Sequence, residues 1–184
     1  MADHLAVTVP LSSIERIQIY VNSARRSLPQ IQAETGADYI LNGTLYNTRT
    51  FAPVCHLKVD GTVLCNPDYS VMGYAWDDGP DIFMDSLPDP ARRDYIACTP
   101  LIVSSKPLSK LTYDSGQGGK RGRSVIGIKG DRLSLYCTRD GGSMARTPEA
   151  LRDDLAAAGW DSAVMLDGGG SSSCWFRGNK LISD

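Results

Sequence analysis

One stretch, VMLDGGGSSS at residues 164–173, constrains the fold of this chain more than any other. A short apolar run, typical of a buried strand, ends at Asp167, and three glycines and three serines follow without interruption. Glycine permits positive φ and lets a ligand approach the main chain closely, and bare amides followed by hydroxyls suit phosphate or another oxyanion. A glycine-rich turn beside a solvated aspartate would contain the same residues, so both interpretations stay open. The run is not a Walker P-loop, because no lysine follows it, nor is it a dinucleotide fingerprint.

The length and charge of the chain favour one globular domain spanning residues 1–184. A chain of 184 residues is long enough to bury a substantial core. Its net charge of −2 gives no electrostatic footprint for nucleic acid, and no apolar run approaches the ~20 residues that span a bilayer. The first residues include acidic Asp3 and no basic segment before an apolar core. We therefore expect no signal peptide and a protein that is cytoplasmic as synthesised.

The cysteines and histidines predict neither a disulfide nor a metal site. The five cysteines are scattered without a Cys-x-x-Cys pair, which is typical of small buried hydrophobic residues in a reducing compartment. His4 and His56 are the only histidines, and they lack metal-ligand spacing. We therefore expect no metal and no cofactor. The remaining alternative is a divalent cation such as calcium at Asp77, Asp81 and Asp85, although their spacing is not that of an EF-hand.

The N-terminal part of the chain shows patterns of a strand, a helix and a second strand. Alternating apolar and polar residues at 13–20 predict the first strand. Residues 22–35 predict a helix that ends before Gly36 and is shortened or kinked by Pro29. Residues 39–41 predict a short strand that leads into an Asn-Gly pair.

The middle of the chain is rich in turn-forming residues. Apolar runs on either side of Asp60-Gly61 predict a hairpin with a type I′ turn. Residues 66–95 contain four prolines and several aspartates, which predict a long ordered loop or lid. Trp76 in this segment would stack on a sugar ring or pack over the edge of the core, and we favour the second interpretation. Residues 114–123 predict a flexible basic loop.

The clearest hairpin covers residues 124–137 around a Gly130-Asp131 turn. Its register sets Arg123 opposite Thr138 and places both on one face with Asp140. A guanidinium group suits bidentate recognition of phosphate, and a neighbouring carboxylate would orient it. An arginine next to a strand is also commonly a solvated charge at the sheet edge, and this alternative stays open.

A strong helix start lies near the C-terminus. Thr147 suits the N-cap position and Pro148 the first helical position, and Gly159 predicts the end of the helix. Residues 163–166 predict a short strand that leads directly to Asp167. Strands and helices that alternate within one short chain predict an α/β or α+β fold with a mixed β-sheet core flanked by helices.

Four stretches occur along the chain in a distinctive order: YILNGTLYN at residues 39–47, RGRSVIGI at 121–128, the Thr-Pro helix start, and LDGGGSSS at 166–173. In this order they resemble the phosphodiester glycosidase family. The resemblance implies a hydrolase that cleaves the C1–O bond of a sugar whose leaving group is a phosphate ester. The catalytic candidates are then Arg123, Asp140 and Asp167, and the substrate-binding candidates are Asn42, Gly43, Trp76, Gly168, Gly169, Gly170, Ser171 and Ser172.

The chemistry that the resemblance implies makes limited demands on the protein. Phosphate is already a good leaving group, because its second pKa is about 6. The site must therefore hold the phosphate, stabilise an oxocarbenium-like sugar and activate water. We hypothesise that Arg123 and residues 168–172 hold the phosphate, and that Asp167 acts on the sugar as nucleophile or base. Asp140 would be the second carboxylate or would orient Arg123.

The partner that we expect is a phosphosugar or glycosyl-phosphate substrate. N-acetylhexosamine phosphates, cell-wall polymers and nucleotide sugars all stay open, and association with a phage particle is a further hypothesis. The alternative function is a non-catalytic module that binds a phosphosugar or cyclic nucleotide in the same pocket. Asp167 separates the two functions, because its loss should abolish turnover in an enzyme and change only affinity in a binding module.

Overall fold

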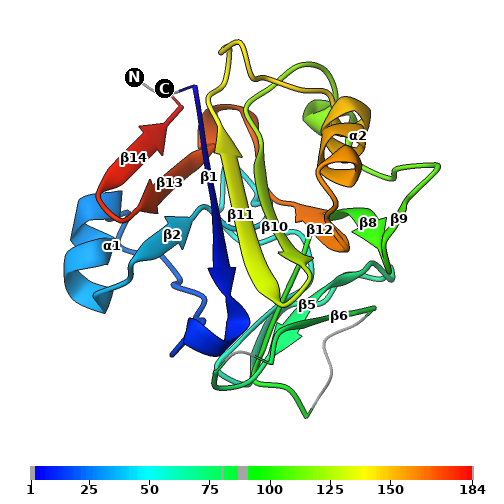
Figure 1. Cartoon of the computed structure of the whole chain (residues 1–184). Helices are drawn as coiled ribbons and strands as arrows, with labels where there is room; N and C mark the ends of the chain where they lie inside the picture. Colours follow the sequence, from blue (N-terminus) through cyan, green and yellow to red (C-terminus); the bar gives the residue numbers. More distant parts are fainter. Residues whose placement is uncertain (1–2, 80, 87–90, 184) are drawn as a thin grey trace.

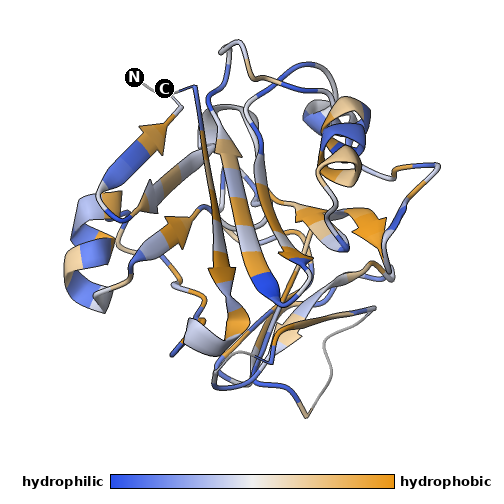
Figure 2. Cartoon of the chain, viewed as in Figure 1, coloured by the Kyte–Doolittle hydropathy of each residue, from blue (hydrophilic) through white to orange (hydrophobic). Residues whose placement is uncertain are grey.

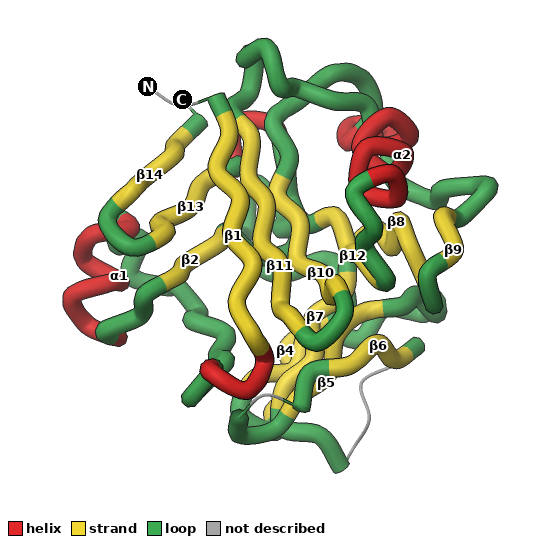
Figure 3. Tube along the Cα trace, viewed as in Figure 1, coloured by secondary structure: helices red, strands yellow, loops and turns green. Residues whose placement is uncertain are grey.

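The structure of the chain is a computed structural model that describes residues 3–79, 81–86 and 91–183. Strands predominate in these residues, and two α-helices lie at the periphery of the molecule (Figures 1 and 3). The fold is therefore sheet-rich and α+β, as the sequence predicts. Among the described residues, no helix is long and apolar enough to cross a membrane.

The described strands form three sheets, and the pairings within them are antiparallel. The six-stranded sheet has the order β1 (His4–Pro10), β11 (Arg132–Thr138), β10 (Ser124–Lys129), β12 (Ser162–Met165), β8 (Thr99–Val103) and β9 (Lys106–Pro107). The three-stranded sheet has the order β14 (Asn179–Ile182), β13 (Ser173–Phe176) and β2 (Tyr39–Leu41). The five-stranded sheet has the order β4 (Thr62–Cys65), β3 (Leu57–Val59), β7 (Asp94–Ala97), β5 (Gly73–Trp76) and β6 (Phe83–Asp85). The helices are α1 (Leu28–Thr35) and α2 (Pro148–Ala157), with short 3₁₀ turns at Leu11–Ser13, Ser115–Gln117 and Gly169–Ser171.

The central hairpin of β10 and β11 has the predicted register. Ile128 lies opposite Leu133, and Ile126 lies opposite Leu135. Three of these four side chains are buried in the main hydrophobic cluster, and Ile128 packs against it. All three sheets contribute to that cluster, and apolar residues recur along the central strands while α1 is mostly hydrophilic (Figure 2). The hairpin thus anchors the chain segments that lead into the site.

The cysteines and the second predicted hairpin also take the expected form. The five thiols are free, and Cys65 alone among them is not fully buried. Asp60 and Gly61 both have positive φ, of 48° and 79°, at the turn between β3 and β4. A type I′ turn requires this conformation at both central residues.

Local capping chemistry sets the ends of both helices. The Thr147 hydroxyl accepts a hydrogen bond from the Ala150 amide, so α2 begins where the sequence predicts. Gly36 ends α1 with φ of 68°. The start of α1 was predicted six residues too early: the helix begins at Leu28, and Pro29 lies in its first turn, where a missing amide costs nothing.

The prediction of a strand at residues 13–20 is wrong. These residues form no strand, although Ile14, Ile17 and Ile19 do pack against the core. The strand in this part of the chain is β1, which pairs with β11 along seven residues. Alternating hydrophobicity reports side-chain burial, but a strand also needs a free sheet edge, and β1 already covers the edge of β11.

The prediction of a loop or lid at residues 66–95 is also corrected. This segment contains β5 and β6, and β7 begins within it. Pro80, Pro88 and Pro90 lie outside the described residues. Trp76, at the end of β5, is only 2% exposed, and its indole N–H donates to the Ile17 carbonyl at 3.1 Å. It belongs to the core, which is the interpretation of Trp76 that the sequence favoured over a sugar-stacking role.

The cap of α2 gives the first testable prediction. Replacing Thr147 by alanine removes the acceptor for the Ala150 amide and should cost about 1 kcal/mol. For a chain of this size the melting temperature should fall by about 3 °C. Thr112→Ala, at an exposed threonine outside the helices and strands, is the matched control and should leave the melting temperature unchanged. Equal melting temperatures for the two variants would contradict the assigned cap.

Candidate functional site

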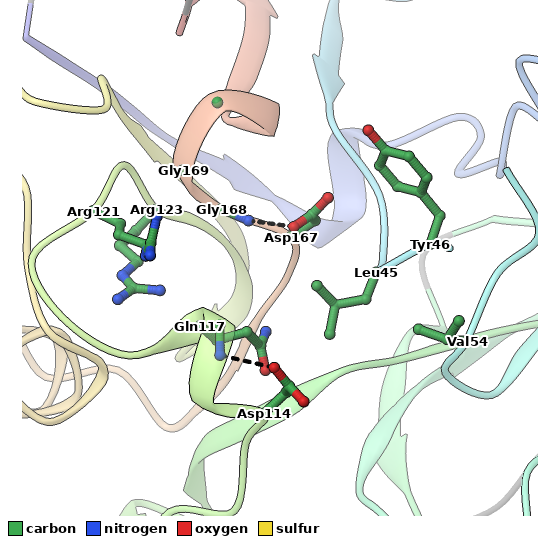
Figure 4. Close-up of a pocket in the computed structure, with 12 residues that line it drawn as sticks. Leu45, Tyr46, Val54, Asp114, Gln117, Arg121, Arg123, Asp167, Gly168 and Gly169 are labelled. Carbon is green, nitrogen blue, oxygen red and sulfur yellow. Dashed lines mark hydrogen bonds between the residues drawn. The ribbon is translucent and has the colours of Figure 1, made fainter. Parts of the chain in front are cut away.

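A pocket of about 350 Å³ opens beside Asp167 (Figure 4). Its walls come from the glycine run after β12, from the segment that precedes β10, and from the residues that follow β2. The two arginines lie on one side of Asp167, and Leu45 and Tyr46 lie on the other (Figure 4). The lining residues are Leu45, Tyr46, Val54, Asp114, Gly116, Gln117, Arg121, Arg123, Asp167, Gly168, Gly169 and Gly170.

The Asn42 side chain links three chain segments that surround Asp167. Its side-chain oxygen accepts hydrogen bonds from the Ser124 hydroxyl and, at 3.0 Å, from the Ser173 amide. Its side-chain nitrogen donates to the Asp167 carbonyl at 2.9 Å. These contacts use both ends of the carboxamide and hold the Asp167 main chain, and Asn42, predicted to bind substrate, is not among the residues that line the pocket. Gly43 accepts from the Asp167 amide through its carbonyl at 3.1 Å and lines a neighbouring cavity instead of this one.

Asp167 presents its carboxylate to the pocket. One carboxylate oxygen accepts from the Gly168 amide at 2.8 Å. Burial raises the pKa of this carboxyl above its ordinary value of 3.8, and hydrogen bonds from the Ser171 side chain and the Gly168 amide oppose the rise. The group is thus a partly desolvated carboxylate held at the end of a buried strand.

Arg123 is the second residue that the sequence correctly places at this pocket. It is only 1% exposed. Its guanidinium donates to the carbonyls of Arg146 and Gly119, each at 2.8 Å. Within the described ranges, no carboxylate lies within ion-pair distance of it. Burial, reinforced by the charge of nearby Arg121, lowers the pKa of this guanidinium.

A buried cation without a counter-ion makes the pocket favourable for an anion. Removing a guanidinium from water costs several kcal/mol unless an opposite charge compensates. Arg121 adds a second, exposed guanidinium at the rim, where its Nε donates to the Gly118 carbonyl at 3.0 Å. Two guanidinium groups on one side of the pocket suit an oxyanion such as phosphate.

Asp140 does not take the predicted catalytic position. Its carboxylate accepts from the Gly122 amide at 2.7 Å, and it is not among the residues that line the pocket. The predicted neighbourhood does form, because the Arg123 amide donates to the Thr138 hydroxyl at 2.8 Å. The guanidinium, however, points to main-chain carbonyls and makes no ion pair with Asp140. Asp140 therefore fixes the backbone before Arg123 rather than orienting the guanidinium directly.

The glycine run supplies fewer free amides than predicted. The Gly169 amide donates to the Gly122 carbonyl, the Ser171 and Ser172 amides donate to carbonyls within the run, and the Gly168 amide donates to the Asp167 carboxylate. In the described part of the chain only the Gly170 amide of this run lacks a partner. Ser171 and Ser172 do not line the pocket. The buried Ser172 hydroxyl lies instead beside Gly122, where a Cβ would sit 2.9 Å from it.

Two polar side chains at the pocket were not predicted. Asp114 lies at its rim and accepts from the Gly116 amide at 2.7 Å. Gln117 is 7% exposed and lines the pocket from the same 3₁₀ turn. This segment, predicted as a flexible basic loop, therefore contains a 3₁₀ turn that the prediction did not include. The sequence Asp-Ser-Gly-Gln, with an aspartate that can cap a turn, is the signal that could have revealed it.

Two of the three aspartates of the calcium alternative pair with an arginine. Asp77 and Asp81 both accept hydrogen bonds from the Arg92 guanidinium, at 2.6 and 3.1 Å. Within the described residues, no group of three or more His, Cys, Asp or Glu side chains could hold a metal ion.

The glycine run offers a matched pair of substitutions. A Cβ on Gly168 would lie 2.7 Å from the Gly122 carbonyl oxygen, whereas a Cβ on Gly170 would meet nothing within 4 Å. Gly168→Ala should therefore lower the free energy of unfolding by about 1–3 kcal/mol. Gly170→Ala should change it by less than about 0.5 kcal/mol. Chemical denaturation of both variants measures the difference, and equal stabilities would contradict the close approach of the two loops.

Comparisons with solved structures identify the fold. The catalytic domain of zebrafish N-acetylglucosamine-1-phosphodiester α-N-acetylglucosaminidase, auto-inhibited by its pro-peptide, is similar with a TM-score of 0.69 and 14% identity, over 98% of this chain and 76% of that one. A hypothetical protein from Synechocystis is similar with a TM-score of 0.67 and 11% identity, over 99% of this chain and 54% of that one. A putative exported protein from Burkholderia pseudomallei is similar with a TM-score of 0.54 and 12% identity, over 100% of this chain and 69% of that one.

These identities establish a common fold, and the chain spans about half the length of the Synechocystis structure. A search of curated proteins finds no match to this chain. The family model of the phosphodiester glycosidases matches residues 20–184, which is most of the sequence. With the fold and the LDGGGSSS site in agreement, this chain belongs to the phosphodiester glycosidase family.

Proposed function

We propose that this protein hydrolyses sugar-1-phosphodiesters by cleaving the bond between C1 of the sugar and the phosphate oxygen. The observation that carries the proposal is Arg123, a buried guanidinium without a carboxylate partner, in the same pocket as the partly buried Asp167. The first group requires an anion, and the second can act on an adjacent electrophilic carbon. A phosphodiester of a sugar provides both in one molecule.

The phosphate would lie on the arginine side of the pocket. Arg123 is held by the Arg146 and Gly119 carbonyls and needs no reorganisation to accept an anion. Arg121 at the rim and the unpartnered Gly170 amide add donors around the same space. In this arrangement the charge that develops on the departing oxygen is stabilised by groups already in place.

Asp167 would act on the sugar. Water attacks C1, the C1–O bond breaks, and its electron pair stays on the phosphate oxygen. Asp167 either takes the proton from the attacking water or first attacks C1 itself. Asp114, the other carboxylate at the pocket, is the candidate for the second carboxylate in place of Asp140. The leaving oxygen needs little help from an acid, because the second pKa of a phosphate ester is about 6.

The substrate class within the proposal is an N-acetylhexosamine phosphodiester, a cell-wall glycosyl phosphate or a nucleotide sugar. A pocket of about 350 Å³ is at the small end of ligand sites and suits one sugar with its phosphate. The competing function is capture of a phosphosugar or cyclic nucleotide without turnover. It requires the arginines but not the carboxylate of Asp167, so substitutions separate the two.

Turnover of N-acetylglucosamine 1-phosphodiesters tests the proposal. Asp167→Asn should lower kcat by roughly a thousandfold while binding persists, because the amide keeps the shape and loses the base. Arg121→Ala should lower kcat/KM by roughly tenfold or more through loss of a charged phosphate contact. Lys120→Ala, which removes an adjacent exposed cation outside the pocket, is the control. Binding without turnover by the wild type would establish the binding module instead.

The pKa of Asp167 predicts the pH dependence. An ionised Asp167 is required, so kcat/KM should fall as the pH drops through its folded-state pKa, which burial places above 3.8. A raised pKa also means that the ionised carboxylate costs stability in the folded state. That cost is absent below the unfolded pKa and fully present above the folded pKa.

The stability of Asp167→Asn therefore provides an independent readout. The melting temperature of Asp167→Asn minus that of the wild type should be larger at pH 7 than at pH 3. The reason is that the wild type carries a buried charge at pH 7 and the amide carries none. A pH-independent difference, or an acidic limb at or below pH 3.8, would show that burial does not control this carboxyl.

A further inference from the structure

A second cavity, of about 760 Å³, adjoins the first on the side away from the arginines. Leu45 and Tyr46 line both cavities, and Figure 4 shows them across Asp167 from the two guanidinium groups. The other walls come mainly from residues between 19 and 25 and between 50 and 53. None of these walls holds the phosphate or carries the catalytic carboxylate, so the proposed reaction does not explain this cavity.

The reacting sugar sets the direction in which a longer substrate would extend. Its C1 must lie at Asp167, and the phosphate on C1 must point toward the arginines. In a pyranose ring C4 lies across the ring from C1, so the oxygen on C4 points away from the phosphate. From Asp167 that direction leads past Leu45 and Tyr46 into the second cavity. A group on the far side of the sugar would therefore enter this cavity, whereas a group on the other phosphate oxygen would extend away from it.

Exposed apolar side chains gather on the second cavity. Val21, Tyr46 and Phe51 all line it, and they are 52%, 40% and 53% exposed. Tyr46 and Phe51 stack with ring centroids 6.0 Å apart and an interplanar angle of 15°. Exposed apolar side chains that lie together mark ligand-binding grooves. Ser23 and Thr50 add hydroxyl groups to the walls, and aromatic faces beside hydroxyl groups suit the CH faces and hydroxyls of a sugar ring.

Arg25 gives the second cavity one positive charge. Its guanidinium carbon lies 4.1 Å from the centroid of the Phe51 ring. In the described part of the chain no carboxylate pairs with it, whereas its neighbour Arg26 pairs with Glu34 at 2.6 Å. No other charged side chain lines the cavity in the described structure. A single guanidinium beside an aromatic face matches the single negative charge of a sugar carboxylate.

We propose that the second cavity is a subsite for a second sugar unit, which is linked to the far side of the reacting sugar and carries a carboxylate. The proposal rests on the proposed function and narrows its substrate class to oligosaccharide 1-phosphodiesters with a uronic acid next to the reacting sugar. The first pocket would hold the reacting sugar and its phosphate. Tyr46 and Phe51 would contact the second sugar, and Arg25 would pair with its carboxylate.

Four substrates with the same reacting sugar test the proposal. The parent is the methyl ester of N-acetylglucosaminyl 1-phosphate. Two others carry glucose or glucuronic acid on O4 of the N-acetylglucosamine, and the fourth carries glucose on the phosphate in place of methyl. Phe51→Ala should lower kcat/KM about fivefold for both O4-substituted substrates and leave the other two within about twofold. Arg25→Ala should lower it about fivefold for the glucuronic acid substrate alone.

Matched variants separate the subsite from general effects. Phe51→Tyr keeps the aromatic ring and should keep the preference for the O4-substituted substrates. Arg16→Ala removes an exposed arginine outside both cavities, and Val63→Ala removes an apolar side chain that is 50% exposed on β4. Neither of these two should change the order of the four substrates.

Binding to Asp167→Asn provides a measurement that needs no turnover. By calorimetry, the substrate with glucose on O4 should bind about fivefold more tightly than the parent, and the glucuronic acid substrate about fivefold more tightly again. Adding Phe51→Ala should remove the first advantage, and adding Arg25→Ala should remove the second. Adding Arg16→Ala should keep both.

The outcomes distinguish this proposal from the function on which it rests. Equal turnover of all four substrates, insensitive to Phe51→Ala and Arg25→Ala, would overturn the subsite and leave the glycosidase intact. Absence of turnover by the wild type, together with Phe51-dependent binding of the O4-substituted substrates, would overturn the glycosidase and support the subsite. Absence of both turnover and binding would overturn both.

Two further outcomes test the assignment of each group. A loss in Phe51→Ala confined to the substrate with glucose on the phosphate would place the cavity on the leaving-group side and overturn the proposal. Equal losses for the glucose and glucuronic acid substrates in Arg25→Ala would overturn the assignment of the carboxylate.

Discussion

The carboxamide of Asn42 is the interaction on which the rest of the site depends. It joins Asn42 to Ser124, Asp167 and Ser173, which lie 82, 125 and 131 residues further along the chain. One side chain thereby connects the end of β2 with β10, β13 and the loop after β12. An amide in this position is favourable only when its donor and acceptor are both used, since an unpaired buried polar group costs about 1–3 kcal/mol. The main chain at Asp167 is thus fixed before any ligand arrives.

The groups that the proposed reaction needs are unfavourable for stability. Arg123 is buried without a carboxylate, and two main-chain carbonyls compensate its charge only partly. Burial also raises the pKa of the Asp167 carboxyl, so the ionised form destabilises the folded state above that pKa and not below the unfolded one. A phosphate bound beside Arg123 would relieve the first cost, and a bound ligand stabilises the folded state by mass action. A bound phosphate would thus supply the negative charge that the Arg123 guanidinium lacks in the folded protein.

The sequence predicted what local chemistry decides. The turn at Gly130-Asp131 and the start of α2 were placed correctly, because turn and cap residues act on their nearest neighbours. Asp167 was found from the glycine run that follows it and Arg123 from the hairpin register, and the order of the motifs added to both. The structure brings them to one pocket. Asp140 was misplaced because its side-chain direction depends on a distant partner, the Gly122 amide. Trp76 follows the favoured of its two interpretations and packs in the core, where its indole N–H donates to the Ile17 carbonyl. Asp114 was missed for the same reason as Asp140, because only the folded chain brings its turn to the pocket.

Two of the three glycines beside Asp167 are required, each for a different reason, whereas the third is unrestricted. Gly168 has an extended backbone and no room for a side chain, because the Gly122 carbonyl would lie 2.7 Å from its Cβ. Gly169 has φ of 61°, which most residues adopt only at a cost. Gly170 has neither restriction, is exposed, and carries the one amide of the run without a partner in the described structure. The first two therefore shape the loop and dock it against the segment that carries Arg123. Only Gly170 leaves space that a phosphate could enter. The main role of the run is therefore to let two main-chain segments pack closely beside the Asp167 carboxylate.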